Sequence, residues 1–191
     1  MTIPSPPTPA NLHAHPDSAR AAPFDLVVRN AHVVTAADHM DCDIGITDGR
    51  VQALGLGLAP GQREIDAAGR VVTPGGVDAH CHLDQPMPPP ARMADDFDTG
   101  TRSAACGGTT TVIPFAAQAK GQSLRAAVAD YHQRSDGKAH VDYAFHLIVS
   151  DPTPEVLQVE LPQLIREGYT SFKIYMTYDD LKLDDGQILD V

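Results

Sequence analysis

From residue 74 to residue 191 the chain alternates β-type segments with helix-type segments. The β-type segments lie at 77–82, 109–115, 141–149 and 170–176, and the helix-type segments at 95–105, 123–134 and 153–167. This alternation is typical of a parallel sheet whose strands are joined by crossover helices. A complete eight-fold βα barrel needs roughly 250 residues. We therefore expect residues 74–191 to form about half of a barrel, and the sequence to be truncated, because 186–191 resembles the opening of a helix.

Residues 23–73 show a different pattern, in which short β-type runs are separated by turn signals. Asp48 and Gly49 lie between two such runs, and a type I′ turn needs positive φ at both central positions, which this pair tolerates. The pattern predicts a meander that forms a small sheet or part of a sandwich. Residues 1–22 contain five prolines and few large apolar residues, so we expect a disordered tail in which His13 and His15 hold no metal.

Composition excludes several classes of partner. The chain has 14 Lys and Arg against 25 Asp and Glu, a formal net charge of −11, which would repel nucleic acids and anionic lipids. No apolar run approaches the roughly 18 residues of a membrane-spanning helix, and no secretory signal is evident. Cys42, Cys81 and Cys106 show no CxxC spacing, which is typical of a reducing compartment. We expect a cytoplasmic protein without nucleic-acid or membrane partners.

Two histidines flank Cys81 at the end of the first expected barrel strand. Side chains alternate along a strand, so His80 and His82 point the same way and could hold one cation. Catalytic groups of parallel barrels gather where the strands end. The motif alone is weak, however, and two histidines in a polar loop remain an alternative. Cys81 should point to the opposite face and pack there.

The expected fourth strand carries a lysine among alternating side chains. Phe172, Ile174 and Met176 fall on one face, and Ser171, Lys173 and Tyr175 on the other. If the apolar face packs against the helices, Lys173 points into the barrel. A buried ammonium must be ion-paired, neutral or chemically changed. A neutral amine can add carbon dioxide to form a carbamate that bridges two cations, so this segment leaves both an ion pair and a carbamate open.

Four stretches together resemble the dihydropyrimidinase and hydantoinase branch of the amidohydrolases. They are VVTPGGVDAHCHLDQP, DDFDTGTRSAACGGTTTVIPF, DYAFHLIV and SFKIYMTYDDLKLDDGQILDV, and the resemblance extends from residue 24 to residue 191. It implies that His80 and His82 bind one metal and that N6-carboxylated Lys173 bridges two divalent cations, with zinc as the expected metal. It also implies that Tyr178 contacts the substrate carbonyl and that His146 is structural. His132 and His140 flank a polar turn, and we expect them to be solvated.

The resemblance further implies an α/β fold with a partial TIM (β/α)8 barrel preceded by a small β-sandwich domain, and a homotetramer of the whole protein. The implied reaction opens dihydropyrimidines or hydantoins to N-carbamoyl amino acids. Two cations would share a hydroxide that attacks the small cyclic amide, and Tyr178 would donate a hydrogen bond to the oxyanion. The sequence offers no candidates for two further histidines and an aspartate, so the fragment alone should be inactive.

Several alternatives remain. Dihydroorotases place an arginine soon after the two histidines, whereas His82 is followed by Leu83, Asp84, Gln85 and Pro86, which argues against that activity. Another cyclic amidohydrolase such as an allantoinase, a non-catalytic dihydropyrimidinase-like scaffold and an inactive gene product stay open. Retention of both histidines and Lys173 favours an enzyme over a scaffold. The proline-rich loop 87–90 leaves the preferred ring substituent undetermined.

Overall fold

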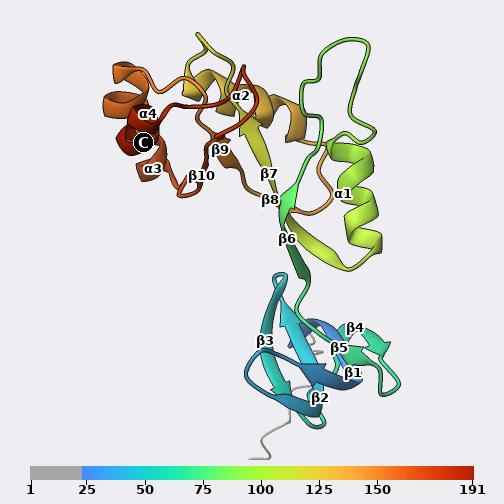
Figure 1. The fold of residues 1–191 in the computed structure, drawn as a ribbon. Helices are drawn as coiled ribbons and strands as arrows, with labels where there is room; N and C mark the ends of the chain where they lie inside the picture. Colours follow the sequence, from blue (N-terminus) through green and yellow to red (C-terminus); the bar gives the residue numbers. More distant parts are fainter. Residues whose placement is uncertain (1–22) are drawn as a thin grey trace, which may run out of the picture. The chain divides into compact units, whose positions relative to one another are not determined.

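The structure, a computed structural model, describes residues 23–191, which divide into two compact units between Pro74 and Gly75 (Figure 1). The expected tail at 1–22, with His13 and His15, lies outside the described residues. No helix within 23–191 has the length and apolar character needed to cross a membrane. Each unit is built around its own sheet.

The first unit contains one five-stranded sheet. Its strands are β1 (Phe24–Val34), β2 (His39–Thr47), β3 (Arg50–Gly55), β4 (Gly61–Asp66) and β5 (Val71–Val72). The order is β3-β2-β1-β4, and β5 also pairs with β1. The expected meander is wrong for β4 and β5, which run parallel to β1. The segment 56–60 carries the chain from β3 across to β1, whereas a meander would have placed β4 beside β3.

The predicted hairpin between β2 and β3 is confirmed. Asp48 and Gly49 have φ of 51° and 69°, and the flanking residues Thr47 and Arg50 pair across the turn. A small apolar cluster forms on this sheet from Ala31, Val33, Cys42, Ile44 and Ala67. The described residues of this unit contain one sheet, so the second layer of a sandwich stays a prediction.

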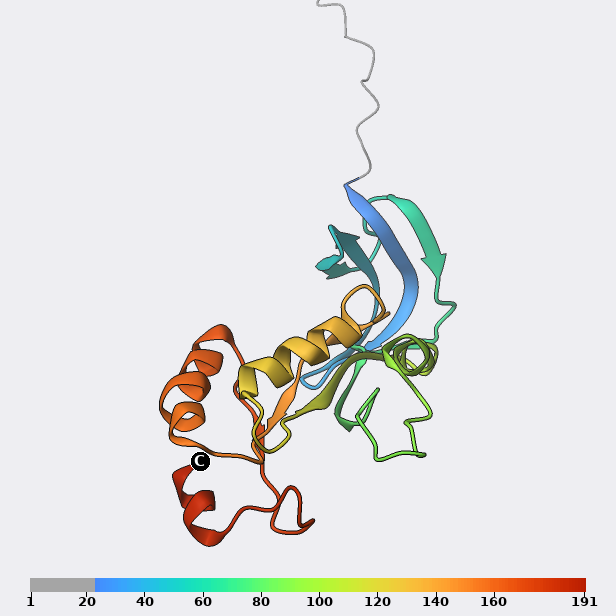
Figure 2. The same ribbon diagram turned by 90° about the horizontal axis from the view of Figure 1, so that it is seen from above.

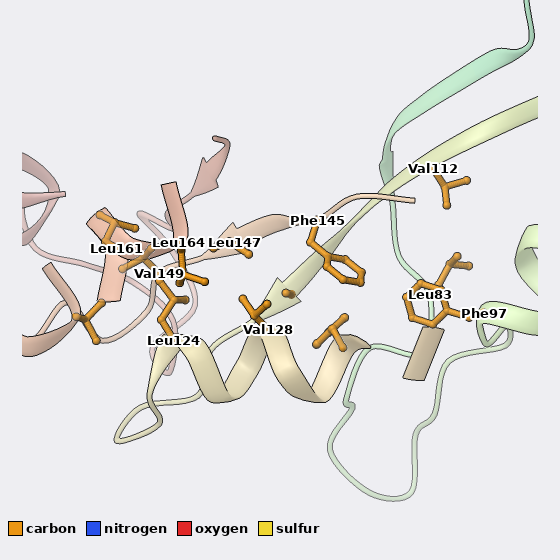
Figure 3. Packing of buried hydrophobic residues seen from close by; sticks show 13 residues of the cluster. Leu83, Phe97, Val112, Leu124, Val128, Phe145, Leu147, Val149, Leu161 and Leu164 are labelled. Atoms are coloured by element: carbon orange, nitrogen blue, oxygen red, sulfur yellow. The ribbon is translucent and has the colours of Figure 1, made fainter. Parts of the chain in front are cut away.

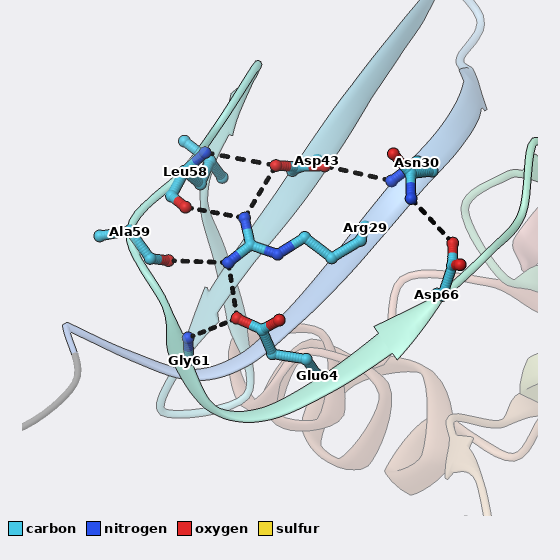
Figure 4. Close-up of polar contacts among 8 residues, drawn as sticks. All are labelled: Arg29, Asn30, Asp43, Leu58, Ala59, Gly61, Glu64 and Asp66. Carbon is cyan, nitrogen blue, oxygen red and sulfur yellow. Dashed lines mark hydrogen bonds and ion pairs between the residues drawn. The ribbon is translucent and has the colours of Figure 1, made fainter.

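An arginine joins the strands of the first unit (Figure 4). Arg29 of β1 donates from Nη1 to Asp43 on β2 at 2.8 Å and to the Leu58 carbonyl at 2.7 Å. From Nη2 it donates to Glu64 on β4 at 2.6 Å and to the Ala59 carbonyl at 3.4 Å. The guanidinium lowers the pKa of both carboxyl groups from their usual values. Arg29 therefore satisfies the carbonyls of the crossing segment and links β1 to β2 and β4.

The second unit contains a parallel sheet and helices. Its strands are β6 (Gly76–Cys81), β7 (Thr109–Ala117), β8 (Asp142–Tyr143), β9 (His146–Ile148) and β10 (Phe172–Lys173), and its helices are α1 (Phe97–Cys106), α2 (Leu124–Ser135), the π-helical η1 (Val156–Glu160), α3 (Leu161–Glu167) and α4 (Asp185–Asp190). The sheet order is β10-β9-β7-β6, with β8 beside β7, and all pairs are parallel. Neighbouring strands follow one another along the chain, which gives the mixed α/β fold and curled half-barrel sheet predicted from the sequence (Figure 2).

Two expected strands of this sheet are shorter than predicted. The segment 141–149 forms two pieces, β8 and β9, and Phe145 between them turns into the core. The segment 170–176 forms only β10, because this edge strand has a single neighbour and Tyr175 instead bridges to Lys182. Met176 is consequently 79% exposed, and its expected packing beside Phe172 is wrong.

The helix boundaries follow local capping chemistry. Ser123 caps α2 as predicted, with its hydroxyl accepting from the Ala126 amide. Asp96 caps α1 in a reciprocal arrangement with Thr99. After α1 the predicted left-handed glycine is Gly108, with φ of 89°.

The main core lies between one face of the parallel sheet and the helices (Figure 3). The figure shows Leu124 and Val128 of α2 close to the segment that carries Leu147 and Val149. Leu83, which directly follows His82, belongs to the same core and is 8% exposed. A Cβ at Gly100 of α1 would lie 2.4 Å from the Leu83 side chain, so this close approach requires glycine. The core thereby anchors the loop that leaves the histidine motif.

Candidate active site

The face of the parallel sheet opposite the core carries the candidate functional groups. We call this the site face and define it by five residues: His80, His82, Phe115, His146 and Lys173. The residues that alternate with them, including Val112, Leu147 and Phe172, pack in the core. Cys81 also packs against the core as predicted, and desolvation raises the pKa of its thiol to about 11. The alternation inferred from sequence therefore places His80 and Lys173 on a common face.

Phe115 of β7 lies at the centre of the site face. The rings of His80, His82 and His146 lie 4.8, 5.0 and 4.9 Å from its ring centroid, and the His82 and His146 rings stack on it. The Lys173 Nζ lies 4.1 Å from the same centroid. Phe115 is only 5% exposed. Phe115 was not among the site residues predicted from the sequence, although the alternation along 109–115 puts it on the face opposite Val112.

His80 and His82 come together as the motif predicted. Their ring centroids are 5.6 Å apart, and the ring planes are inclined at 62°. β6 ends at Cys81, so His82 lies just beyond the strand. The His82 Nδ1 lies 2.6 Å from the Gln85 side-chain oxygen. His80 is exposed, whereas His82 is half-buried.

Lys173 has no carboxylate partner among residues 23–191. None of the ion pairs found in that range includes it. Its ammonium instead faces the rings of Phe115 at 4.1 Å and Tyr175 at 4.9 Å, and the side chain is half-buried. Cation–π contacts of this kind hold an amine without neutralising it. The ion-pair interpretation of Lys173 therefore finds no support in the described part of the chain.

Tyr178 lies in the loop after β10. Its φ is 67°, and its carbonyl accepts from the Leu181 and Lys182 amides at 2.8 Å each, so a tight turn presents the side chain. The residue as a whole is 68% exposed. Tyr178 lines a hollow of about 760 Å³ together with His82 and Lys173. The turn therefore brings the tyrosine to the same hollow as two of the predicted metal ligands.

A second hollow, of about 430 Å³, is lined by His80, Phe115, His146 and Lys173. Lys173 borders both hollows. The four predicted site residues thus lie around two hollows that share this lysine.

Both ring nitrogens of His146 make contacts within the protein, in keeping with the structural role predicted for it. Its Nε2 lies 2.9 Å from the Ala79 carbonyl and its Nδ1 lies 2.6 Å from the Ser171 hydroxyl. In the neutral ring, Nε2–H donates to the carbonyl and Nδ1 accepts from the hydroxyl. His146 therefore links the strand of His80 to the segment that leads to Lys173.

Two other histidines make specific contacts. The His132 side chain is 39% exposed, and its Nε2 lies 2.6 Å from the Tyr169 hydroxyl. On its other side it packs on α2 against Phe145. His140 is exposed, and its Nε2 lies 2.6 Å from Asp98.

The residues present suit part of a metal centre. Two neighbouring imidazoles are ligands that zinc prefers, and an unpaired amine is the group from which a carbamate ligand can form. Within 23–191, no cluster of three or more His, Cys, Asp or Glu residues could hold a metal ion by itself. A complete centre would therefore need ligands in addition to those described.

The chain is similar to a known protein family and to solved hydantoinase structures. Residues 71–144 match the Amidohydrolase family. The D-hydantoinase of Ralstonia pickettii is 44% identical over 166 residues, which cover 87% of this chain and 36% of that protein. A solved D-hydantoinase structure has 43% identity and a TM-score of 0.83, and covers 87% of this chain and 36% of its own. A dihydropyrimidinase structure from Brevibacillus agri has 42% identity and a TM-score of 0.81, with 86% and 36% covered. The chain spans about 36% of the length of the curated relative.

Proposed function

This chain is related to the dihydropyrimidinase and hydantoinase family, as its motifs predicted, and on that premise we propose that the whole protein hydrolyses cyclic amides. The reaction would open dihydropyrimidines or hydantoins to N-carbamoyl amino acids. One observation carries the proposal: His80, His82 and an amine without a carboxylate partner, Lys173, share the site face around Phe115.

The protein would hold two divalent cations, with zinc as the expected metal. His80 and His82 would bind one, and a carbamate on Lys173 would contribute oxygens to both. Bound there, the cations would act as Lewis acids that polarise the ring amide and lower the pKa of a water molecule. Further ligands would be needed, because within residues 23–191 no group of three or more His, Cys, Asp or Glu residues could hold a metal ion.

The surroundings of Lys173 favour the modification. Aromatic rings, and no carboxylate within residues 23–191, lie beside its Nζ, so no ion pair occupies the nitrogen that would carry the carbamate. The lone pair of the neutral amine forms a bond to the carbon of carbon dioxide, and the nitrogen then releases a proton. The product is an anionic carbamate, which suits a site that holds cations.

Tyr178 would act on the substrate. Its hydroxyl would donate a hydrogen bond to the carbonyl oxygen as negative charge develops there, which lowers the barrier to attack. The turn at Tyr178 presents this side chain to the hollow shared with His82 and Lys173.

The direct test is ring opening of hydantoin and dihydrouracil by the purified whole protein, before and after removal of metal with a chelator. We expect turnover that is lost with the metal and returns when zinc is added back. Allantoin as a third substrate distinguishes an allantoinase. A whole protein that purifies without metal and opens none of these rings would support the scaffold alternative and contradict the proposal.

The isolated 191-residue chain serves as the matched control. Within the described residues β6 and β10 are the edges of the sheet, each with one neighbour, and exposed edges promote association between chains. We expect this chain to show no turnover and to aggregate. Turnover that survives metal-free controls would contradict the proposed site.

We also infer how the whole protein is organised. Residues 74–191 would form the first half of a (β/α)8 barrel, a reading supported by the sequential strand order, and residues 23–73 would contribute to a β-sandwich. A homotetramer in the cytoplasm is the expected assembly and location, and the three free cysteines are in keeping with a reducing compartment. Light scattering on the whole protein measures the assembly.

A further inference from the structure

Gln85 makes a specific contact with one of the proposed metal ligands. Its side-chain oxygen lies 2.6 Å from the His82 Nδ1, and both residues are half-buried. We propose that Gln85 is a positioning residue that keeps the His82 proton on Nδ1 and leaves Nε2 as the metal-binding nitrogen. This inference rests on the proposed function.

The chemistry of the two groups dictates the tautomer. A glutamine carbonyl oxygen can only accept a hydrogen bond, and a neutral imidazole has one N–H and one lone pair. With the oxygen facing Nδ1, this hydrogen bond forms only when the proton lies on Nδ1, which leaves the lone pair on Nε2. Histidines that bind metals usually donate their other N–H to an oxygen in this way, which fixes the ring and raises its basicity.

The protein holds both partners of this contact rigidly. The His82 ring stacks on Phe115 at 5.0 Å with an interplanar angle of 23°. The turn before Gln85 is anchored at Asp84, whose amide donates to the Asp95 carbonyl at 3.0 Å and whose carbonyl accepts from Arg134 at 3.2 Å. Gln85 therefore reaches His82 from a fixed turn, and the ring has little freedom to rotate.

The glutamine has no competing role in the described part of the chain. Its contact with His82 is the single side-chain hydrogen bond found for Gln85 within residues 23–191. Gln118, by contrast, bonds to several backbone groups and serves the fold. Gln85 also lines the larger hollow with His82 and Lys173. These contacts point to a role in the site and not in the core.

The experiment uses the whole protein with three substitutions. Gln85→Met removes the acceptor at similar volume, Gln85→Glu keeps an acceptor oxygen, and Gln133→Met makes the same change at an exposed position of α2. Chelator competition measures zinc affinity. We expect Gln85→Met to weaken zinc binding about 10- to 100-fold, with near wild-type affinity for Gln85→Glu and Gln133→Met. Wild-type affinity in Gln85→Met would overturn the proposal.

A second readout needs neither metal nor activity. ¹⁵N NMR of the metal-free wild-type protein, with the His82 signal assigned by its absence from His82→Asn, reports which ring nitrogen carries the proton. We expect Nδ1–H, and a mixture of tautomers in Gln85→Met. A predominant Nε2–H form in the wild type would overturn the proposal even if a variant failed to fold. Absence of zinc binding by the wild type would instead contradict the proposed function.

Discussion

Two cations, Arg29 in the first unit and Lys173 in the second, have opposite surroundings. Arg29 donates to two carboxylates and two backbone carbonyls, and its side chain is 20% exposed. Lys173 is also half-buried, yet it faces two aromatic rings and, within residues 23–191, no carboxylate. Both belong to sheets, and only one has its charge neutralised.

The difference separates a structural cation from one available for chemistry. Arg29 links β1 to β2, to β4 and to the segment 56–60. Its charge is therefore paired with groups that hold the first unit together. An ion pair of that kind would hold Lys173 in its protonated form. Lys173 lacks such a pair in the described structure, which leaves its amine available for the proposed reaction with carbon dioxide.

The largest expected effect is on turnover when Lys173 is replaced in the whole protein. Lys173→Ala should lose at least one metal and orders of magnitude in turnover. Lys173→Arg should be equally inactive, because a guanidinium cannot become a carbamate. A small carboxylic acid should partly restore the alanine variant. Lys138→Ala, at an exposed position, is the control and should behave as wild type. Both metals and substantial activity in Lys173→Arg would make Lys173 a structural charge.

The second effect is on stability. Here replacing Arg29 should cost more than replacing Lys173, the opposite of the order expected for turnover. Arg29→Leu leaves Asp43 and Glu64 without their partner, so the melting temperature of the metal-free protein should fall by several degrees. Lys173→Leu removes an unpaired ammonium and should change it little. Calorimetry measures both, and the double variant Arg29→Leu/Asp43→Leu should recover part of the loss. Equal destabilisation by the two single variants would remove the distinction.

The smallest effect concerns acid. Arg29 depresses the pKa of Asp43 and Glu64 in the folded state. Their stabilisation is present above the ordinary carboxyl pKa of about 4 and is lost as pH falls through the lower folded values. The melting temperature of wild type should therefore decline below about pH 4 more steeply than that of Arg29→Leu. Parallel declines would show that Arg29 does not hold these carboxylates ionised.

Much of the site could be predicted from local patterns. Strand alternation placed His80 and Lys173 on one face and Cys81 on the other, and the Asp48–Gly49 pair predicted its hairpin. These features depend on periodicity and backbone preferences, which neighbouring residues determine.

Other features depend on contacts between distant segments. The central place of Phe115 requires four strands to meet around one ring, and nothing in 109–115 alone reveals it. The parallel pairing of β4 with β1 depends on how the segment 56–60 crosses between the strands, where the Leu58 carbonyl accepts a hydrogen bond from Arg29. Met176 is exposed because the pairing of β10 with β9 stops at Lys173. Where an edge strand stops depends on its neighbour in the sheet, which lies far away in the sequence.

Direct detection of the carbamate carbon tests whether Lys173 is modified. The whole protein is loaded with zinc in ¹³C-enriched bicarbonate, and ¹³C NMR is recorded for wild type and Lys173→Arg. We predict one enriched carbamate carbon in the wild type, absent from the variant and lost together with activity when zinc is removed. An active, zinc-loaded wild-type protein without that carbon would contradict it.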